Sequence, residues 1–247
     1  RHGHRNVRGE RATLGLTATQ YLTDRLTLRA ALRYDFEDVS DATGDTTYRT
    51  VSLPLGAVWD SRDRPLDARK GSFADVEIRP FFTFGDGDGD AGLRIRAEAR
   101  GYLSPGAADR VTVAARLQAG AVFGPGLLQT PRGDLFYSGG GGTVRGQPYQ
   151  SLGVRVPDPS LGGQAFLAAS AEVRLRITDV IGAVAFVDWG HVGGLDFFDD
   201  LGGSHAGAGL GLRYDTGFGP IRLDVAAPVS GETGEGVQVY IGIGQAF

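Results

Sequence analysis

Cysteine and methionine are missing from this 247-residue chain, and lysine occurs once, at Lys70. Without cysteine, the chain has no disulfide bridges or thiolate metal sites. No run of 18 apolar residues occurs, which excludes a transmembrane helix but not spanning β-strands, whose apolar residues alternate with polar ones. Because no initial methionine or signal peptide precedes the first expected strand, we expect the chain to begin inside a longer polypeptide.

The chain also lacks the usual signs of nucleic-acid binding and of catalysis. Its 25 basic residues are balanced by 29 acidic ones, so we expect no nucleic-acid partner. Gly-x-Ser-x-Gly and His-Glu-x-x-His motifs are absent, and we expect no enzyme activity, no cofactor and no metal. Residues 85–90 alternate glycine with aspartate but lack the spacing and closing glutamate of an EF-hand, so they are interpreted as a hairpin tip.

Alternation of apolar and charged residues is the strongest pattern in the chain. Residues 93–100 read Leu-Arg-Ile-Arg-Ala-Glu-Ala-Arg, and residues 26–35, 172–177 and 221–225 alternate in the same way. A period of two is typical of β-strands with one apolar face, and no segment has a convincing helical period. The pattern predicts eleven strands, at residues 10–21, 25–38, 47–61, 71–85, 91–104, 110–123, 165–178, 180–193, 205–216, 219–229 and 236–247.

The chemistry of the polar face favours a transmembrane antiparallel β-barrel over a soluble β-sandwich. A sandwich exposes its polar face to water and usually carries many lysines there, whereas this face carries arginine with aspartate or glutamate. Arginine suits crowded carboxylate networks because its planar guanidinium binds carboxylates in a bidentate manner. The predicted strands are also long enough to cross a bilayer when tilted.

The connections between the strands support a barrel. They alternate between long and short, as in outer-membrane barrels, which have long external loops and short periplasmic turns. The longest, residues 124–164, contains the glycine run 139–142, and we expect it to enter the lumen. An odd number of strands would leave the two ends on opposite sides, so we expect several N-terminal strands to be absent from this chain.

Several segments together are similar to the BamA/TamA superfamily, the bacterial surface antigen family of outer-membrane assembly and secretion barrels. They are Val144-Arg145-Gly146, Phe186-x-Asp188-x-Gly190, and the two closing segments 219–224 and 240–247. The ending resembles TamA, the translocation and assembly module subunit, most. The resemblance implies that residues 1–247 are about the last eleven strands of a sixteen-stranded barrel, whose first strands and POTRA domains are absent from the chain.

By this resemblance, the long loop carries an arginine latch. Arg145 would pair with Asp188, which points inward if Val187 and Trp189 face lipid, and Glu172 has the right parity to join. The resemblance adds Val144, Gly146, Phe186 and Gly190 to the same site. Family members often have an aromatic residue directly after Val-Arg-Gly, where this chain has Gln147. The aromatic contact is therefore either supplied by Tyr149 or missing.

The last strand would form one side of a lateral seam, and its candidate residues are Tyr240, Gly242, Gly244 and Phe247. We expect Phe247 to lie in the outward aromatic girdle of the barrel. The strand glycines would weaken packing and help the seam to open. These expectations concern one side of the seam, because the strand expected on its other side is not part of this chain.

The function implied is assembly or translocation in the bacterial outer membrane, by insertion or export of β-barrel or autotransporter clients through the seam. The partners implied are the lipid bilayer, those clients, and a TamB-like protein anchored in the inner membrane that binds the POTRA domains. Three alternatives remain: a two-partner secretion pore, a general porin-like channel, and an outer-membrane enzyme with its nucleophile and histidine at the rim.

Overall fold

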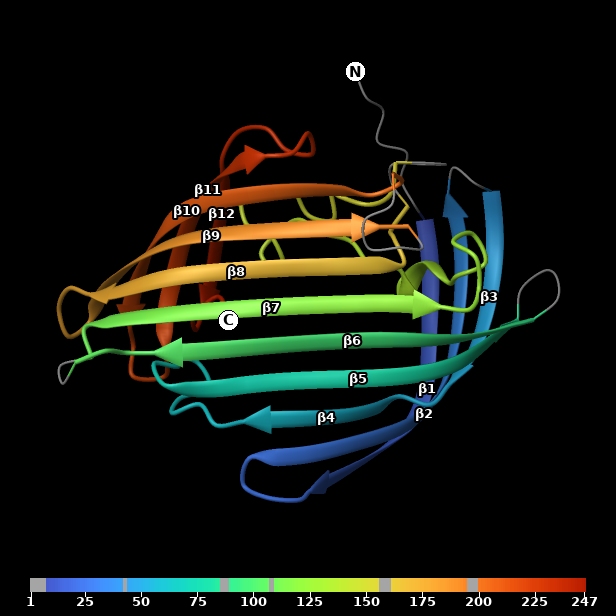
Figure 1. The fold of residues 1–247 in the computed structure, drawn as a ribbon, viewed down its shortest axis with the longest axis horizontal. Coiled ribbons are helices and arrows are strands. Elements are labelled where there is room, and N and C mark those ends of the chain that lie inside the picture. The colour runs from blue at the N-terminus through green and yellow to red at the C-terminus, as the bar shows by residue number, and fades with distance from the viewer. Residues whose placement is uncertain (1–7, 42–43, 85–88, 107–108, 156–160, 195–199) are drawn as a thin grey trace.

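The computed structural model describes residues 8–41, 44–84, 89–106, 109–155, 161–194 and 200–247, and it confirms the all-β fold (Figure 1). One short 3-10 helix, η1 (Arg132–Asp134), is present in these ranges. The strands are β1 (Arg8–Tyr21), β2 (Leu26–Asp41), β3 (Gly44–Ser52), β4 (Leu55–Asp60), β5 (Gly71–Phe84), β6 (Asp90–Leu103), β7 (Val111–Phe123), β8 (Ala165–Arg176), β9 (Ile181–Gly193), β10 (Gly203–Asp215), β11 (Pro220–Ser230) and β12 (Gln238–Ile243).

All twelve strands belong to one antiparallel sheet, consistent with part of a β-barrel. Its order follows the sequence from β1 to β12, with β3 and β4 together occupying one position between β2 and β5. Figure 1 shows the middle strands running across the view while the two ends of the sheet turn away from them. Within the described ranges, β12 pairs with β11 and has no partner on its other side.

The predicted strand 47–61 is divided into β3 and β4 at Leu53-Pro54. Proline has no backbone N–H and interrupts a ladder for that reason. The Pro54 carbonyl still accepts a 2.9 Å hydrogen bond from the Ala31 N–H, and the Leu53 N–H donates to Pro80 at 3.0 Å. The interruption is therefore local, and the two pieces act as one strand in the sheet.

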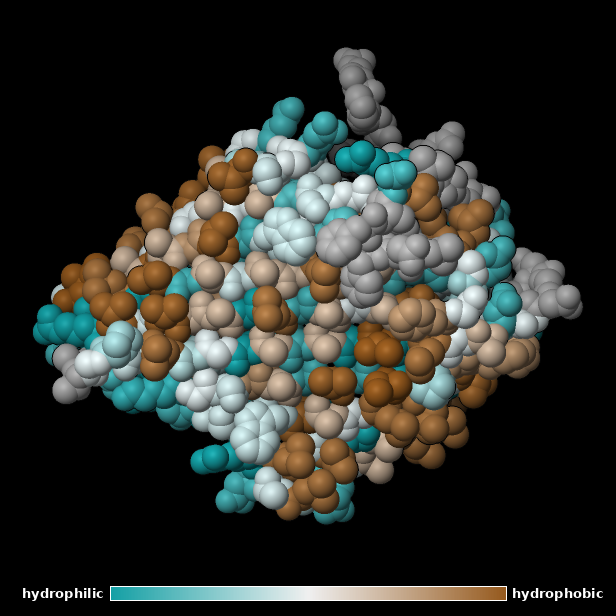
Figure 2. Space-filling view, viewed as in Figure 1, coloured by the Kyte–Doolittle hydropathy of each residue, from teal (hydrophilic) through white to brown (hydrophobic). Residues whose placement is uncertain are grey.

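The outward face of the sheet is apolar. Figure 2 shows apolar residues over the middle strands and hydrophilic ones at the left end of the view, where these strands turn. Exposed apolar side chains occur on neighbouring strands across this face, among them Val76, Ile78, Leu117, Val173, Val187, Leu210, Leu223 and Ile241. Such a band fits a hydrocarbon environment better than water. In the described segments, no helix has the length and hydropathy needed to cross a membrane.

The long loop between β7 and β8 lies against the concave face of the sheet. The Tyr48 hydroxyl on β3 donates to the Leu128 carbonyl at 2.9 Å, and the Gly133 N–H donates to the Glu37 carboxylate on β2 at 3.0 Å. The loop therefore reaches strands far from its own ends.

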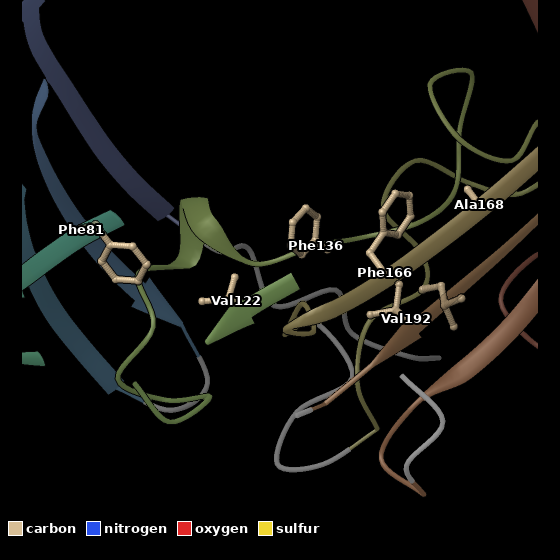
Figure 3. Packing of buried hydrophobic residues seen from close by; sticks show 7 residues of the cluster. Phe81, Val122, Phe136, Phe166, Ala168 and Val192 are labelled. Carbon is tan, nitrogen blue, oxygen red and sulfur yellow. The ribbon is translucent and has the colours of Figure 1, made fainter. Parts of the chain in front are cut away.

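An apolar cluster fixes the middle of this loop. Phe136 stacks on Phe166 of β8 with ring centroids 5.6 Å apart and an interplanar angle of 6°. Figure 3 shows Phe136 between Phe81 and Val122 on one side and Phe166 and Val192 on the other. Because residues from β5, β7, β8 and β9 join two loop residues, Phe136 and Leu152, the loop takes the place of a core inside the curved sheet.

The end of the chain differs from the expected continuous strand. β12 ends at Ile243, and Gly244 has a φ of +83°, which turns the last residues inward. Phe247 is only 7% exposed and packs with Ala68, Tyr102 and Ala114. This corrects the expected position of Phe247 in the outward girdle: the alternation does not extend beyond Ile243.

Candidate functional site: an arginine latch between loop and sheet

Hydrogen bonds between residues of the loop shape its tip. Ser138 and Leu152 form an isolated antiparallel bridge, with each N–H donating to the other carbonyl at 3.0 Å. Inside this bridge, the Gly140 N–H donates to the Gln147 carbonyl at 3.0 Å. The Thr143 hydroxyl accepts from the Gly139 N–H at 2.8 Å. These contacts make residues 138–152 a closed, self-supporting turn that presents Arg145.

The Arg145 guanidinium is 3% exposed and is surrounded by carboxylates. Its Nε and Nη2 donate to the two oxygens of Asp188 at 2.7 and 3.0 Å, which is a bidentate pair. Its Nη1 donates to Glu172 at 2.7 Å and to Asp224 at 3.4 Å. We call Arg145 with these three carboxylates the latch. The loop is thereby bound to β8, β9 and β11 at once.

The electrostatics of the latch strongly favour the charged arginine. Burial alone would lower the pKa of the Arg145 guanidinium, but hydrogen bonds and charge from Asp188, with charge from Glu172, raise it above its usual value. The guanidinium carbon also lies 3.5 Å from the centroid of the Phe186 ring, within cation–π range. The guanidinium therefore remains charged in the latch.

Two glycines allow the tip to approach the wall. Gly146 has a φ of +92°, and a Cβ there would lie 2.6 Å from the Ala227 carbonyl oxygen. A Cβ on Gly190 would lie 2.9 Å from the Cγ2 of Val144, which is fully buried. A larger residue at Gly146 would displace the tip from the sheet, whereas one at Gly190 would require the Ser138 and Val144 side chains to shift. The resemblance assigned seven residues to this site, and the structure brings all of them together: Val144, Arg145, Gly146, Glu172, Phe186, Asp188 and Gly190.

The position after Val-Arg-Gly has a polar role. Gln147 is fully buried, and its Nε2 donates to the Ala206 and Ser230 carbonyls at 2.8 and 3.1 Å. Tyr149 is 80% exposed and does not replace the expected aromatic residue. The aromatic partners come from the sheet: Phe186, and Tyr240, whose hydroxyl accepts from the Gly146 N–H at 3.0 Å.

Sequence reasoning missed several residues that complete the site. Asp224 appeared as a polar position in an alternating strand and in the closing segment 219–224, but not among the latch residues, and its parity was the signal that could have placed it on the inner face. His205, on β10, is fully buried and bonds the Ser138 hydroxyl of the loop at 2.8 Å. Its other ring nitrogen lies 2.7 Å from the Thr233 hydroxyl. No sequence pattern pointed to His205.

Two further arginines connect the latch with the end of the chain. Arg174 donates to Glu172 at 2.8 Å and to the Phe247 carbonyl at 3.0 Å. Arg213 donates to Asp224 at 2.5 Å and to the side chain of Gln245 at 2.7 Å. The last four residues are thus attached to the same carboxylates that bind Arg145.

The four seam residues lie at different places. Tyr240 and Gly242 are on the inner face of β12, and Tyr240 contacts the loop tip. Gly244 lies beyond the strand, with its N–H donating to the Pro220 carbonyl at 2.7 Å, and Phe247 lies inside the curved sheet. In the part of the chain that the structure describes, no group of histidine, aspartate and glutamate side chains is arranged to hold a metal. Of the segment 85–90, interpreted above as a hairpin tip, residues 85–88 lie outside the described residues.

Comparison with known proteins agrees with this geometry. The Omp85 superfamily domain matches residues 4–247. The chain belongs to the Omp85 superfamily. This confirms the superfamily expected from the sequence, while the TamA branch stays a prediction.

Solved structures of Omp85-type barrels share the fold. BamA from Haemophilus ducreyi, in a structure lacking POTRA domains 1–3, has a TM-score of 0.70 and 18% identity over 94% of this chain. CdiB from Acinetobacter baumannii has a TM-score of 0.58 and 16% identity over 91% of this chain. The chain spans 52% of the first structure and 39% of the second. At these identities the similarity concerns the fold.

Proposed function

We propose that this Omp85 chain forms the C-terminal wall of a bacterial outer-membrane factor that inserts or exports β-barrel or autotransporter clients through a seam beside β12. The observation that carries the proposal is the loop that fills the concave face of this Omp85 sheet and is held there by the buried latch. We place the seam beside β12, because its edge away from β11 is the edge at which the barrel is expected to close with a strand that is not part of this chain. An unpaired edge can bind an extended segment by β-augmentation.

The register identifies the backbone groups at this edge. The Gly244 N–H donates to Pro220, so even-numbered residues of β12 direct their N–H groups toward β11. The N–H and carbonyl groups of Val239, Ile241 and Ile243 therefore point away from β11. They form the row of donors and acceptors that a client strand would pair with. Their side chains are exposed on the apolar outer face.

Blocking one donor in this row tests the proposal. Ile241→Pro removes an N–H from the open edge without removing any bond to β11, and proline is tolerated on edge strands. Ile241→Ala is the matched control, because it loses the side chain but keeps the N–H. In liposomes containing the full-length protein, we expect Ile241→Pro to reduce insertion of an unfolded β-barrel client, measured as its protease-protected fraction. Insertion at the rate of the alanine variant would contradict the proposal.

A second experiment separates this function from a two-partner secretion pore, which would pass its substrate through the interior. An ideal Cβ on Gly190 would lie 3.3 Å from the Cβ of Ser138, close to the spacing of a disulfide. The pair Ser138→Cys and Gly190→Cys would thus tether the loop to β9. Oxidation should stop a secretion pore and reduction should restore it, whereas seam insertion should be the same in both states.

The latch also supports assembly over a general porin-like channel. A porin loop constricts an open lumen, whereas this loop contributes to buried clusters with four strands and to a buried ionic site. We propose no catalytic role. By resemblance we propose a TamB-like partner anchored in the inner membrane, which would bind POTRA domains of the longer protein. Crosslinking in intact cells would test this partner.

A further inference from the structure

Arg222 has guanidinium nitrogens that bind no acceptor among the described residues. It lies on the inner face of β11, two residues before Asp224. Its Nε and Nη1 are buried and have no hydrogen-bond partner among the described residues. Buried guanidinium nitrogens without a partner are unfavourable, because they lose their hydration and gain no hydrogen bond.

The nearby carboxylates are already bound to other arginines. Both oxygens of Asp188 accept from Arg145. Glu172 is shared between Arg145 and Arg174. Asp224 accepts from Arg213 at 2.5 Å and from Arg145 at 3.4 Å. Arg145, Arg174 and Arg213 thus take up the three carboxylates, and Arg222 has no ion pair with them among the described residues.

Arg222 is also directed toward the open edge. It is the register partner of Gly242 on β12. A Cβ on Gly242 would lie 2.9 Å from the Arg222 Nε and 3.4 Å from its Nη2, so the guanidinium lies over the glycine. A larger residue at Gly242 would occupy this space. The glycine thus lets a cation extend across the last strand toward the position where a further strand would pair.

We propose that Arg222 recognises an aspartate or glutamate on the strand that pairs with β12, at the inward-facing position opposite Gly242. This inference rests on the proposed function, which places a partner strand at that edge. Cross-strand neighbours point to the same face of a sheet, so the side chain opposite Gly242 faces the interior with Arg222.

The ladder pattern brings the two groups close. Val239, Ile241 and Ile243 would make the hydrogen bonds to the new strand, which makes Gly242 part of a non-hydrogen-bonded pair. Opposed residues in such pairs are the closer ones, with Cα atoms about 4.5 Å apart. Outward-facing neighbours of the acidic residue would be apolar, because they would lie beside Ile241 and Ile243 on the apolar face. The partner is thus an amphipathic β-strand with one inward carboxylate at a defined position.

Synthetic peptides provide the test. A fluorescein-labelled ten-residue peptide alternates apolar residues with threonine and carries either Asp or the isosteric Asn at one central inward position. Its binding to the full-length protein in nanodiscs is measured by fluorescence anisotropy, and a photoreactive group beside the central position reports contact with β12. We expect the Asp peptide to bind wild-type protein about tenfold more tightly than the Asn peptide, as for a hydrogen bond to a charged group.

Variants of the protein assign this preference to Arg222. Arg222→Gln should remove it, and Arg222→Glu should reverse it in favour of a peptide with Lys at the central position. Arg96→Gln is the matched control, because it removes another inner-face arginine, on β6, far from β12 in the sheet. If Arg222→Gln fails to fold, equal binding of the Asp and Asn peptides to the wild-type protein still overturns the proposal, and the preference of Arg222→Glu for the Lys peptide still supports it.

The outcomes separate this inference from the proposed function. Equal binding of the Asp and Asn peptides at β12 would overturn the role of Arg222 and leave strand pairing at the edge intact. A preference for Asp that persists in Arg222→Gln would also overturn it. If neither peptide crosslinks to β12, pairing at this edge is refuted, and the role of Arg222 is refuted with it.

Discussion

The planar fork of Arg145 explains why one loop residue can bind three strands. Nε and Nη2 form the bidentate pair with Asp188, which leaves Nη1 for Glu172 and Asp224. A lysine ammonium would supply the same charge but not this planar geometry. The backbone N–H of Arg145 donates to Asp188 as well, at 3.0 Å. The latch therefore fixes both the side chain and the backbone of the loop tip.

Substitution of Arg145 should release the loop. Arg145→Ala leaves three buried carboxylates short of a partner, and breaking a buried pair in this way costs about 3–5 kcal/mol. We expect residues 127–164 to become sensitive to protease and the free energy of unfolding to fall. Arg145→Lys should lie between alanine and wild type. Arg29→Ala, which removes a half-exposed ion pair with Asp75, is the control. Unchanged protease sensitivity in Arg145→Ala would rule out the latch.

The sequence identified these residues to different extents. Alternation placed Glu172 and Asp188 on the inner face, and the resemblance selected Arg145 as their partner. Asp224 is 79 positions away from Arg145, and alternation alone does not show which inner residues meet. Gln147 lies in a loop and His205 bonds the loop residues Ser138 and Thr233, and loops have no periodic pattern to read. Parity therefore predicts the face of a residue, whereas its partner depends on the curvature of the sheet.

At the scale of the elements, the loop between β7 and β8 functions as the core of the curved sheet. Phe136 is its main apolar contact, stacked on Phe166 and packed with residues from four strands. The sequence predicted a loop that enters the lumen, but it gave no sign that Phe136 would be the anchoring residue. Pro54, in contrast, was a readable signal for the break between β3 and β4, because proline interrupts strands.

Truncation of this anchor should weaken the loop without touching the latch. Phe136→Ala removes a buried ring, and such substitutions cost about 3–5 kcal/mol. We expect a lower unfolding midpoint in denaturant and faster hydrogen exchange around residue 136. Tyr149→Ala is a matched control on the same loop, since its ring is exposed, and we expect it to change stability by about 0.5 kcal/mol or less. Equal effects of the two substitutions would show that Phe136 does not anchor the loop.

At the scale of the whole molecule, ionic contacts connect the loop tip with the end of the chain. Arg174 and Arg213 each bind one latch carboxylate and one group in the last four residues. The segment between β4 and β5 joins them, because the Gln245 side chain donates to Asp67 at 2.9 Å. The last predicted strand, 236–247, extends too far. Phe247 has the same parity as the outward-facing Ile241 and Ile243, but the positive φ of Gly244 turns the chain inward before it.

A double-mutant cycle would measure this connection. Arg145 and Arg174 share Glu172, so Arg145→Gln and Arg174→Gln should not be additive in the free energy of unfolding. Residues with a common ionic partner show interaction energies of about 0.5–3 kcal/mol. Arg145→Gln combined with Arg29→Gln is the control pair, because Arg29 bonds Asp75 and shares no carboxylate with the latch. This control should be additive within about 0.5 kcal/mol.

Hydrogen exchange in the same variants would locate the effect. Arg174→Gln removes the donor to the Phe247 carbonyl and the 3.2 Å bond to the Ala68 carbonyl, so exchange should rise at 244–247 and 66–70. If the loop tip and the tail are coupled through Glu172, protection at 143–147 should also fall in that variant. Additivity of Arg145 and Arg174, with exchange altered only in the tail, would mean that the two ends of the network act independently. In that case loop release would have no direct effect on the last strand.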